Sequence, residues 1–247
     1  MNDEQENSNQ EDFPYYPLEA TIAFPDPEES DDGIVCLGGN FSPGVLKSAY
    51  LQGIFPWYNE DTPILWWCPD PRFVLFPEEL HISKSLKKFL RQNKESSSPY
   101  TFTINKAFDK VIDYCAKIQR PDQDSTWITE PLAQGYKEFH REGLALSVET
   151  WQEGNLIGGL YGVLIGSIFF GESMFTLKPN AAKAAFVQFV QAFRQVGGKL
   201  IDSQIYTDNI ARFGGRNISR SAFLRLEDEL LYKPLCEPIT EELLNHF

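Results

Sequence analysis

Three observations predict an α+β fold with a mixed sheet flanked by helices. At 247 residues, 42% hydrophobic and 23% charged, the chain is long enough to bury a core, as one large domain or two small ones. A stretch dense in Pro, Gly and aromatic residues, 24–77, comes before longer periodic segments. In those segments, helical patterns are followed by alternating strands with hairpin signals, and then by a helix and a last strand.

The beginning of the chain divides into a tail and a small domain. Residues 1–12 carry five acids and no bases, so we expect a disordered acidic tail. A small N-terminal domain is expected over residues 13–79. Within it, Ser42 is typical of an N-cap and Pro43 of a first helical position, which predicts a helix to about Gln52.

The larger domain is expected over residues 80–247. Its predicted elements are a helix from near Ser83, a strand at 101–104, helices at about 105–118 and 130–142, strands at 146–151, 156–164 and 167–171, a helix at 180–196 and a strand from 198 to 204. This order is the plan of an acyltransferase-type domain, the GNAT-like layout. The strand-to-helix junction at 176–183 has no glycine. A Gly-rich loop that holds a pyrophosphate is therefore not expected, and the donor is predicted to be something other than acyl-coenzyme A.

The charge pattern leaves a nucleic-acid partner open. The net charge of −13 argues against one, but clustering of cations on one face matters more than the total. Lys84, Lys87, Lys88 and Arg91 follow helical spacing in a stretch, 80–94, without Asp or Glu. This basic stripe is suited to contact phosphates, and the alternative is an ordinary solvated helix face.

Cysteine and histidine usage indicates a reduced compartment and no metal. The four cysteines form no Cys-x-x-Cys pair, and the three histidines show no metal spacing. No apolar run has the length of a membrane span, and the N-terminus lacks the pattern of a secretory signal. We therefore expect a cytoplasmic protein.

Asp202 and Gln204 end the last predicted strand. Residues two apart on a strand point to the same face, so a carboxylate and an amide are expected side by side. Such a pair suits the handling of an amine that attacks an ester. The alternative is a polar strand exit without chemistry.

Five unusual segments stand in order along the chain. They are Gly53–Trp57, Trp66–Arg72, Thr126–Thr129, Gly171–Phe175 and Leu200–Gln204. Together, over residues 24–224, they closely resemble the bacterial leucyl/phenylalanyl-tRNA–protein transferases. The resemblance implies a small N-terminal α/β domain followed by a GNAT-like domain. It also implies transfer of Leu or Phe, and Met less well, from aminoacyl-tRNA to the N-terminal amine of proteins that begin with Arg or Lys, which marks them for N-degron proteolysis.

The resemblance also implies roles for residues. The residue at the position of Gln204 contacts the attacking amine, and the one at Asp202 orients and polarises it. Because an amide is a poor base, our hypothesis is that Gln204 orients the amine, Asp202 stabilises its positive charge and a tRNA ribose hydroxyl relays the proton. Glu172 meets the cationic acceptor, although a structural pair with a protein cation is the alternative. The other implied substrate-binding residues are Ser173, Met174, Trp57, Trp127, Leu160, Phe169, Phe186, Phe189, Phe193 and Ile201. For the apolar ones the alternative is core packing. The basic stripe would hold the acceptor stem of the tRNA. No cofactor is expected because the donor ester is already activated.

Other functions remain possible at this point. A sister transferase that delivers Asp or Glu would need cations on the donor side. A non-catalytic N-degron binding module would need an acidic pocket but neither the basic stripe nor the Asp/Gln pair. An ordinary N-acetyltransferase is disfavoured by the glycine-free junction. We expect a monomer.

Overall fold

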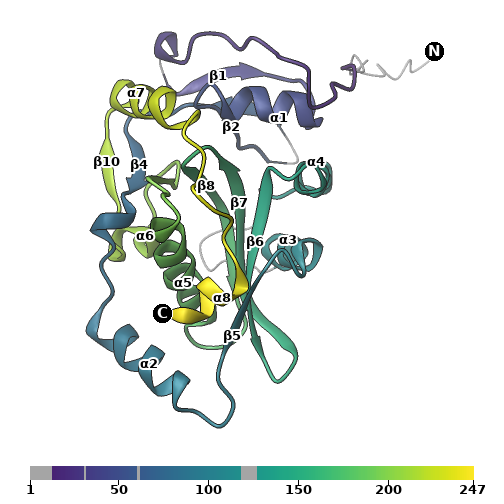
Figure 1. Cartoon of the computed structure of the whole chain (residues 1–247). Coiled ribbons are helices and arrows are strands. Elements are labelled where there is room, and N and C mark those ends of the chain that lie inside the picture. The colour runs from purple at the N-terminus through teal and green to yellow at the C-terminus, as the bar shows by residue number, and fades with distance from the viewer. Residues whose placement is uncertain (1–12, 31, 60–61, 118–126) are drawn as a thin grey trace, which may run out of the picture.

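The N-terminal segment folds around a small antiparallel sheet. The computed structural model describes residues 13–30, 32–59, 62–117 and 127–247, so the expected acidic tail lies outside the described residues. The small sheet has the strand order β1-β3-β2, with β1 at Ile34–Leu37, β2 at Phe55–Pro56 and β3 at Leu65–Trp67. Helix α1, Pro43–Tyr50, lies beside this sheet (Figure 1).

A seven-stranded sheet forms the larger part of the molecule, in the order β10-β4-β9-β8-β7-β6-β5. Its strands are β4 Arg72–Leu75, β5 Thr101–Ile104, β6 Ala145–Gln152, β7 Asn155–Ile165, β8 Ile168–Thr176, β9 Leu200–Asp202 and β10 Arg216–Ile218. Neighbouring strands are antiparallel except β8 and β9, which are parallel. The sheet is therefore mixed, as the sequence predicts.

The helices of the larger part include some that cover the two faces of this sheet. The α-helices after α1 are α2 Lys84–Lys94, α3 Phe108–Lys117, α4 Glu130–Arg141, α5 Ala181–Gln195, α6 Asp208–Arg212, α7 Arg220–Leu230 and α8 Glu241–His246, with short 3-10 helices at Pro27–Glu29 and Pro77–Glu79. Helices α3 and α4 lie on one side of the sheet and α5 on the other (Figure 1). No helix in the part of the chain that the structure describes has both the length and the apolar character needed to cross a bilayer.

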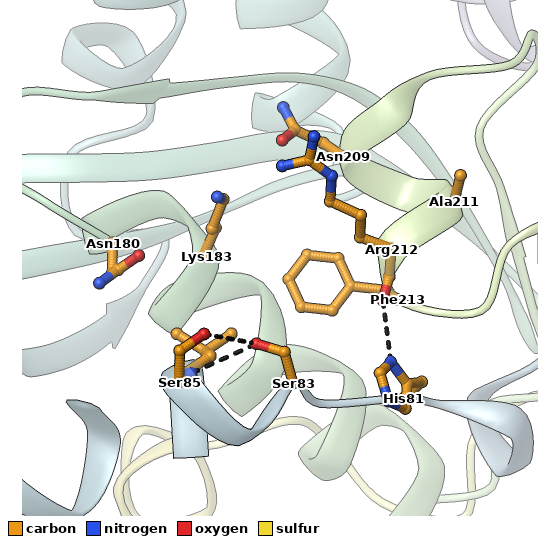
Figure 2. Close-up of a pocket in the computed structure, with 10 residues that line it drawn as sticks. His81, Ser83, Ser85, Asn180, Lys183, Asn209, Ala211, Arg212 and Phe213 are labelled. Atoms are coloured by element: carbon orange, nitrogen blue, oxygen red, sulfur yellow. Dashed lines mark hydrogen bonds between the residues drawn. The ribbon is translucent and has the colours of Figure 1, made fainter. Parts of the chain in front are cut away.

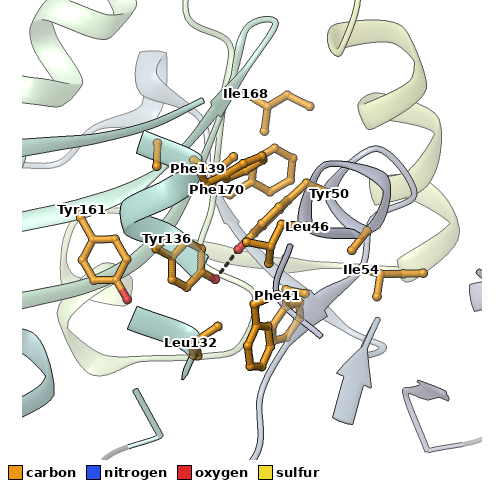
Figure 3. Packing of buried hydrophobic residues seen from close by; sticks show 14 of the residues in the cluster. Phe41, Leu46, Tyr50, Ile54, Leu132, Tyr136, Phe139, Tyr161, Ile168 and Phe170 are labelled. Carbon is orange, nitrogen blue, oxygen red and sulfur yellow. Dashed lines mark hydrogen bonds between the residues drawn. The ribbon is translucent and has the colours of Figure 1, made fainter. Parts of the chain in front are cut away.

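Each face of the sheet has its own apolar core. The first core joins α1, α3, α4 and α7 to one face, and Figure 3 shows Tyr50 and Tyr136 meeting inside it. The second core lies between α5 and the opposite face. Consecutive residues of β8 divide between the two, since Phe169 belongs to the second core and Phe170 to the first. This alternation is what a strand buried on both faces requires.

The helix and strand predictions are confirmed, with differences in detail. Strand β8 runs on to Thr176, beyond the expected end at 171. The Ser42 hydroxyl does not cap α1; it accepts from the Tyr16 N–H and bonds Asn40 instead. Strand β4 joins the large sheet although its residues fall inside the expected N-terminal domain, whose boundary at residue 79 stays a prediction.

Strands β8 and β9 stop pairing close to Asp202. Their last register pair is Phe170 with Asp202, after which β9 ends while β8 continues. The chain beyond Asp202 then bonds to β4: the Ser203 N–H donates to the Phe73 carbonyl and the Phe73 N–H to the Gln204 carbonyl. Beyond residue 170, the edge of β8 that faced β9 therefore no longer pairs with β9.

Candidate active site

Glu172 lies at this divergence as the extra residue of a β-bulge. Tyr161 of β7 pairs with Ser173 and Gly162 pairs with Gly171, so Glu172 has no partner across the ladder. A Cβ on Gly162 would lie 2.2 Å from the Phe170 carbonyl oxygen, so a glycine is needed opposite the bulge. Bulges redirect a side chain out of the regular alternation, and they are common next to active sites.

The Glu172 carboxylate accepts hydrogen bonds from three neutral side chains. The Tyr50 hydroxyl donates to Oε1 over 2.7 Å, the Tyr136 hydroxyl to Oε2 over 2.9 Å, and the Gln204 Nε2 to Oε1 over 3.0 Å. The two tyrosine hydroxyls are themselves 2.6 Å apart. Among the residues that the structure describes, no Lys or Arg forms an ion pair with Glu172. The alternative of a structural ion pair for this residue therefore has no support.

The environment of Glu172 makes it titrate near neutral pH. Burial raises the pKa of the carboxyl to about 7, while the hydrogen bonds from Tyr50 and Tyr136 act in the opposite direction. The charge of Asp202 raises the pKa of Glu172 further, and that of Arg72 lowers it. Burial and the nearby Glu172 charge hold the pKa values of both tyrosines well above their ordinary range, so they remain donors. Glu172 is thus a carboxyl that changes charge in the physiological range.

A fully buried ion pair lies next to this group. The Arg72 Nε donates to Asp202 Oδ1 over 2.9 Å and its Nη2 to Oδ2 over 2.6 Å, and both side chains have 0% exposure. The Arg72 Nη1 also donates to the Gly53 carbonyl over 3.0 Å. The guanidinium carbon lies 4.2 Å from the Phe223 ring centroid and 4.8 Å from that of Phe55. Bidentate geometry and aromatic contacts fix the pair in one orientation.

Gln204 links Asp202 to Glu172 through two hydrogen bonds, one from its backbone N–H and one from its side chain. The Gln204 backbone N–H donates to Asp202 Oδ1 over 2.9 Å, and Gln204 has a φ of 58°, in the left-handed region. Strand β9 ends at Asp202, so the expectation that both residues share one strand face is wrong. The left-handed turn instead directs the Gln204 amide to Glu172. A non-glycine residue in this conformation is uncommon and persists where its surroundings hold it.

The Asp202 carboxylate is enclosed by protein groups. Its two oxygens accept from Arg72 and from the Gln204 N–H, and the side chain has no solvent exposure. Through the Gln204 N–H the carboxylate holds the turn after β9 in place. The expected role of Asp202 toward the attacking amine stays a prediction. Arg72 had no predicted role, although an arginine inside a strand that is buried at every position requires a buried acid partner.

Two of the missed residues are the tyrosine donors. Tyr50 ends α1 and Tyr136 lies in the middle of α4, both at positions that read as ordinary apolar helix faces in the sequence. Only their spatial meeting at Glu172 shows a role. No local spacing in the sequence carries that signal.

The expected aminoacyl pocket residues lie together in the second core. Leu160, Phe169, Phe186, Phe189, Phe193 and Ile201 are buried there, and Met174 packs against them. The Phe169 and Phe189 ring centroids are 4.4 Å apart. Their role in binding an apolar side chain stays a prediction. Ser173, which precedes Met174 in β8 and pairs with Tyr161 of β7, is also buried.

The remaining expected residues lie outside this cluster. Trp57 and Trp127 are half-buried against the first core, and Trp57 contacts Trp67 at a centroid distance of 5.4 Å. The basic stripe forms an exposed face of α2, whose one buried residue is Leu86. Contact of these residues with RNA stays a prediction.

Comparisons with known proteins agree on one family. The family model described as "Leucyl/phenylalanyl-tRNA protein transferase" matches residues 74–228, and the model of that family's N-terminal domain matches residues 39–70. A protein named "Leucyl/phenylalanyl-tRNA--protein transferase" from Anaeromyxobacter sp. (strain Fw109-5) is 47% identical over 220 residues, 89% of this chain and 92% of that protein. Proteins of the same name from Syntrophobacter fumaroxidans and Myxococcus xanthus are each 48% identical. Their alignments cover 87% and 81% of this chain, and 90% and 84% of theirs.

Proposed function

Because the chain belongs to the leucyl/phenylalanyl-tRNA–protein transferase family, we propose that it delivers Leu or Phe to proteins whose N-terminal residue is Arg or Lys. Membership of the family supports the reaction, which is transfer of the amino acid from aminoacyl-tRNA to a protein N-terminus. The chain is therefore an aminoacyltransferase. The proposed consequence for the acceptor is N-degron proteolysis, and Met is proposed as a poorer donor residue.

The observation that carries the acceptor preference is the Glu172 carboxyl. In the part of the chain that the structure describes, its hydrogen-bond donors are neutral side chains, and it lies at the bulge beside Gln204. A buried carboxylate without a cationic partner is costly, and an incoming cation removes that cost. A basic N-terminal residue, or the ammonium form of its α-amine, supplies such a cation.

The proposed chemistry forms one C–N bond and breaks one C–O bond. The acceptor α-amine attacks the ester carbonyl, and the ribose 3′ oxygen leaves with a proton that a neighbouring ribose hydroxyl relays. The Gln204 Nε2 is occupied by Glu172, which leaves its Oε1 to accept an N–H from the amine and orient its lone pair. The Arg72–Asp202 pair holds Gln204 in this position. Orientation of the two reactants is the main catalytic contribution in this scheme.

The donor is proposed to bind across three regions. The apolar residues around Leu160 and Phe189 receive the Leu or Phe side chain, with Met174 as an adaptable wall. A purely apolar site separates similar side chains weakly, which fits acceptance of more than one residue. Trp57 and Trp127 are proposed to contact the ester and the terminal adenosine, and the basic stripe of α2 the acceptor-stem phosphates.

The finer features of architecture and setting are also proposals. The order of antiparallel strands, helix α5 and the parallel strand β9 supports a GNAT-like domain. We place the monomeric enzyme in the cytoplasm, where charged tRNA is found.

Transfer of radiolabelled leucine tests the proposal. Leu-tRNA is incubated with a peptide that begins with Arg, and an Asp-initial peptide and Asp-tRNA serve as controls. Label on the Arg peptide from Leu-tRNA alone is expected. Glu172→Gln should raise KM for the Arg peptide, whereas Glu242→Gln on the exposed face of α8 should not. Binding of the Arg peptide without any label would refute transfer and support the binding-module alternative.

A further inference from the structure

A cavity with both polar and apolar lining residues lies apart from Glu172. Its volume is about 570 Å³, and it opens between the start of α2, the first turn of α5 and helix α6. Its lining residues are His81, Ser83, Ser85, Leu86, Asn180, Lys183, Asn209, Ala211, Arg212 and Phe213. Figure 2 shows Lys183 and Arg212 extending into the same space beside the Phe213 ring.

The cavity is cationic in an acidic protein. No Asp or Glu is among its lining residues, although the net charge of the chain is −13. Lys183 is half-buried and forms no hydrogen bond or ion pair with any residue that the structure describes. The Arg212 side chain is exposed, and among the described residues its ion-pair partner is Asp208, which is also exposed, at 3.9 Å. A lysine held in a cavity without a carboxylate is suited to an anionic ligand.

Neutral donors and an apolar floor complete the site. The Ser83 and Ser85 hydroxyls are 3.1 Å apart at one wall, and the Asn180 and Asn209 amides face the cavity from other elements. Phe213 at the base is buried and contacts Phe186, with ring centroids 4.9 Å apart. The floor of the cavity is therefore continuous with the second core, which holds the proposed aminoacyl pocket.

The cavity adjoins the basic stripe and lies within a short distance of the turn that holds Gln204. The basic stripe begins at Lys84, between the lining residues Ser83 and Ser85. Helix α6 begins four residues after Gln204. With at most about 3.6 Å per extended residue and about 1.5 Å per helical residue, the Arg212 Cα lies within roughly 20 Å of the Gln204 Cα. A short single strand of RNA spans that separation.

We propose that this cavity binds a backbone phosphate of the single-stranded 3′ end of the RNA that delivers the aminoacyl ester. The proposal rests on the proposed function and extends it. Lys183 and Arg212 supply charge, and the serine hydroxyls and asparagine amides supply neutral donors to phosphate oxygens. Such a contact positions the strand without reading its sequence.

Two minimal donors test the proposal. One is leucine esterified to adenosine, which has no phosphate, and the other is leucine esterified to the trinucleotide cytidylyl-cytidylyl-adenosine. We expect Lys183→Gln and Arg212→Gln each to raise KM for the trinucleotide donor about tenfold, as loss of one charged hydrogen bond does. KM for leucyl-adenosine and kcat for both donors should not change. Lys183→Arg should retain most of the trinucleotide preference. Lys233→Gln, an exposed cation on α7's C-terminal side, is the matched control.

Direct binding keeps the test independent of transfer. The affinity of the unacylated trinucleotide is measured against salt concentration, and each variant should lower the slope by about 0.7, the value for one single-strand phosphate. Equal effects on both donors, or no effect on either, would overturn the proposal. So would binding of inorganic phosphate that the variants weaken while trinucleotide binding stays intact, because that result indicates an adventitious anion only. If the unaltered enzyme transfers leucine from neither donor, the proposed function fails while the binding measurement still decides the phosphate site.

Discussion

Replacing Glu172 by Gln should make the protein more stable at alkaline pH. The carboxyl has a pKa of about 7 in the folded protein, against an ordinary value of 4.5. A pKa difference of one corresponds to about 1.4 kcal/mol, so ionised Glu172 lowers the unfolding free energy by about 3 kcal/mol. The residue keeps some accessible surface, and water there reduces this figure toward about 2 kcal/mol. Gln has nearly the same shape and cannot ionise.

The sign of the pH dependence follows from the direction of the pKa shift. Below pH 4.5 the carboxyl is protonated in both the folded and the unfolded chain, and it has no effect on their balance. Between 4.5 and 7 only the folded protein retains the proton, so the unfolding free energy falls as pH rises. Above 7 the loss is complete. The stability gain of Glu172→Gln over the unaltered protein should therefore grow between pH 5 and pH 8 and then level off.

Urea unfolding at pH 5, 6, 7 and 8 measures this gain. The unaltered protein, Glu172→Gln and Glu242→Gln are compared, since Glu242 is exposed at the C-terminal helix and its substitution should show no such pH trend. A gain that is the same at all four pH values would refute the assignment of the raised pKa to Glu172. A loss of stability at pH 8 would show that the carboxylate is stabilised by its tyrosine donors more than it is destabilised by burial.

Three further predictions concern the neighbours of Glu172. Arg72→Ala should lower the unfolding free energy by about 3 to 5 kcal/mol because it leaves the Asp202 carboxylate buried and unpaired. Arg72→Met combined with Asp202→Leu should restore much of this loss in urea unfolding. Additive losses in the double variant would contradict the prediction. Tyr50→Phe removes a hydrogen bond that lowers the pKa of Glu172, so the pH midpoint of peptide transfer should move upward, and an unchanged midpoint would argue against the contact. Burial raises the pKa of Glu227 well above its ordinary range, so Glu227→Gln should stabilise the fold more at pH 8 than at pH 5.5, as seen by thermal unfolding.

The regular elements were predictable because local patterns determine them. The basic helix α2, the meander of β6, β7 and β8, and helix α5 each carry their own periodicity, caps and turns. Helix α2 begins near Ser83 as expected, and the Ser83 hydroxyl accepts a bond from the Leu86 N–H. The prediction that Glu172 and Gln204 end strands rested on the same kind of local information and is wrong in detail, because Glu172 lies inside β8 and Gln204 follows the end of β9.

The contacts that create the site were not predictable in this way. The pairing of Arg72 with Asp202 joins residues 130 apart in the chain, and that of Tyr50 with Glu172 joins residues 122 apart. The bulge at Glu172 depends on the register against β7, which the sequence of β8 alone does not determine. The left-handed conformation of Gln204 also follows from its tertiary bonds, since glutamine has no intrinsic preference for it.

The wide spacing of the groups around Glu172 affects what happens when the chain is cut. Its hydrogen-bond donors come from α1, α4 and the turn after β9, and the acid itself comes from β8. A protease that separates the first 60 residues from the rest, or a ribosome that stops before residue 204, leaves a product without part of this group. We therefore expect truncated products to lose transfer activity rather than to act as shortened enzymes.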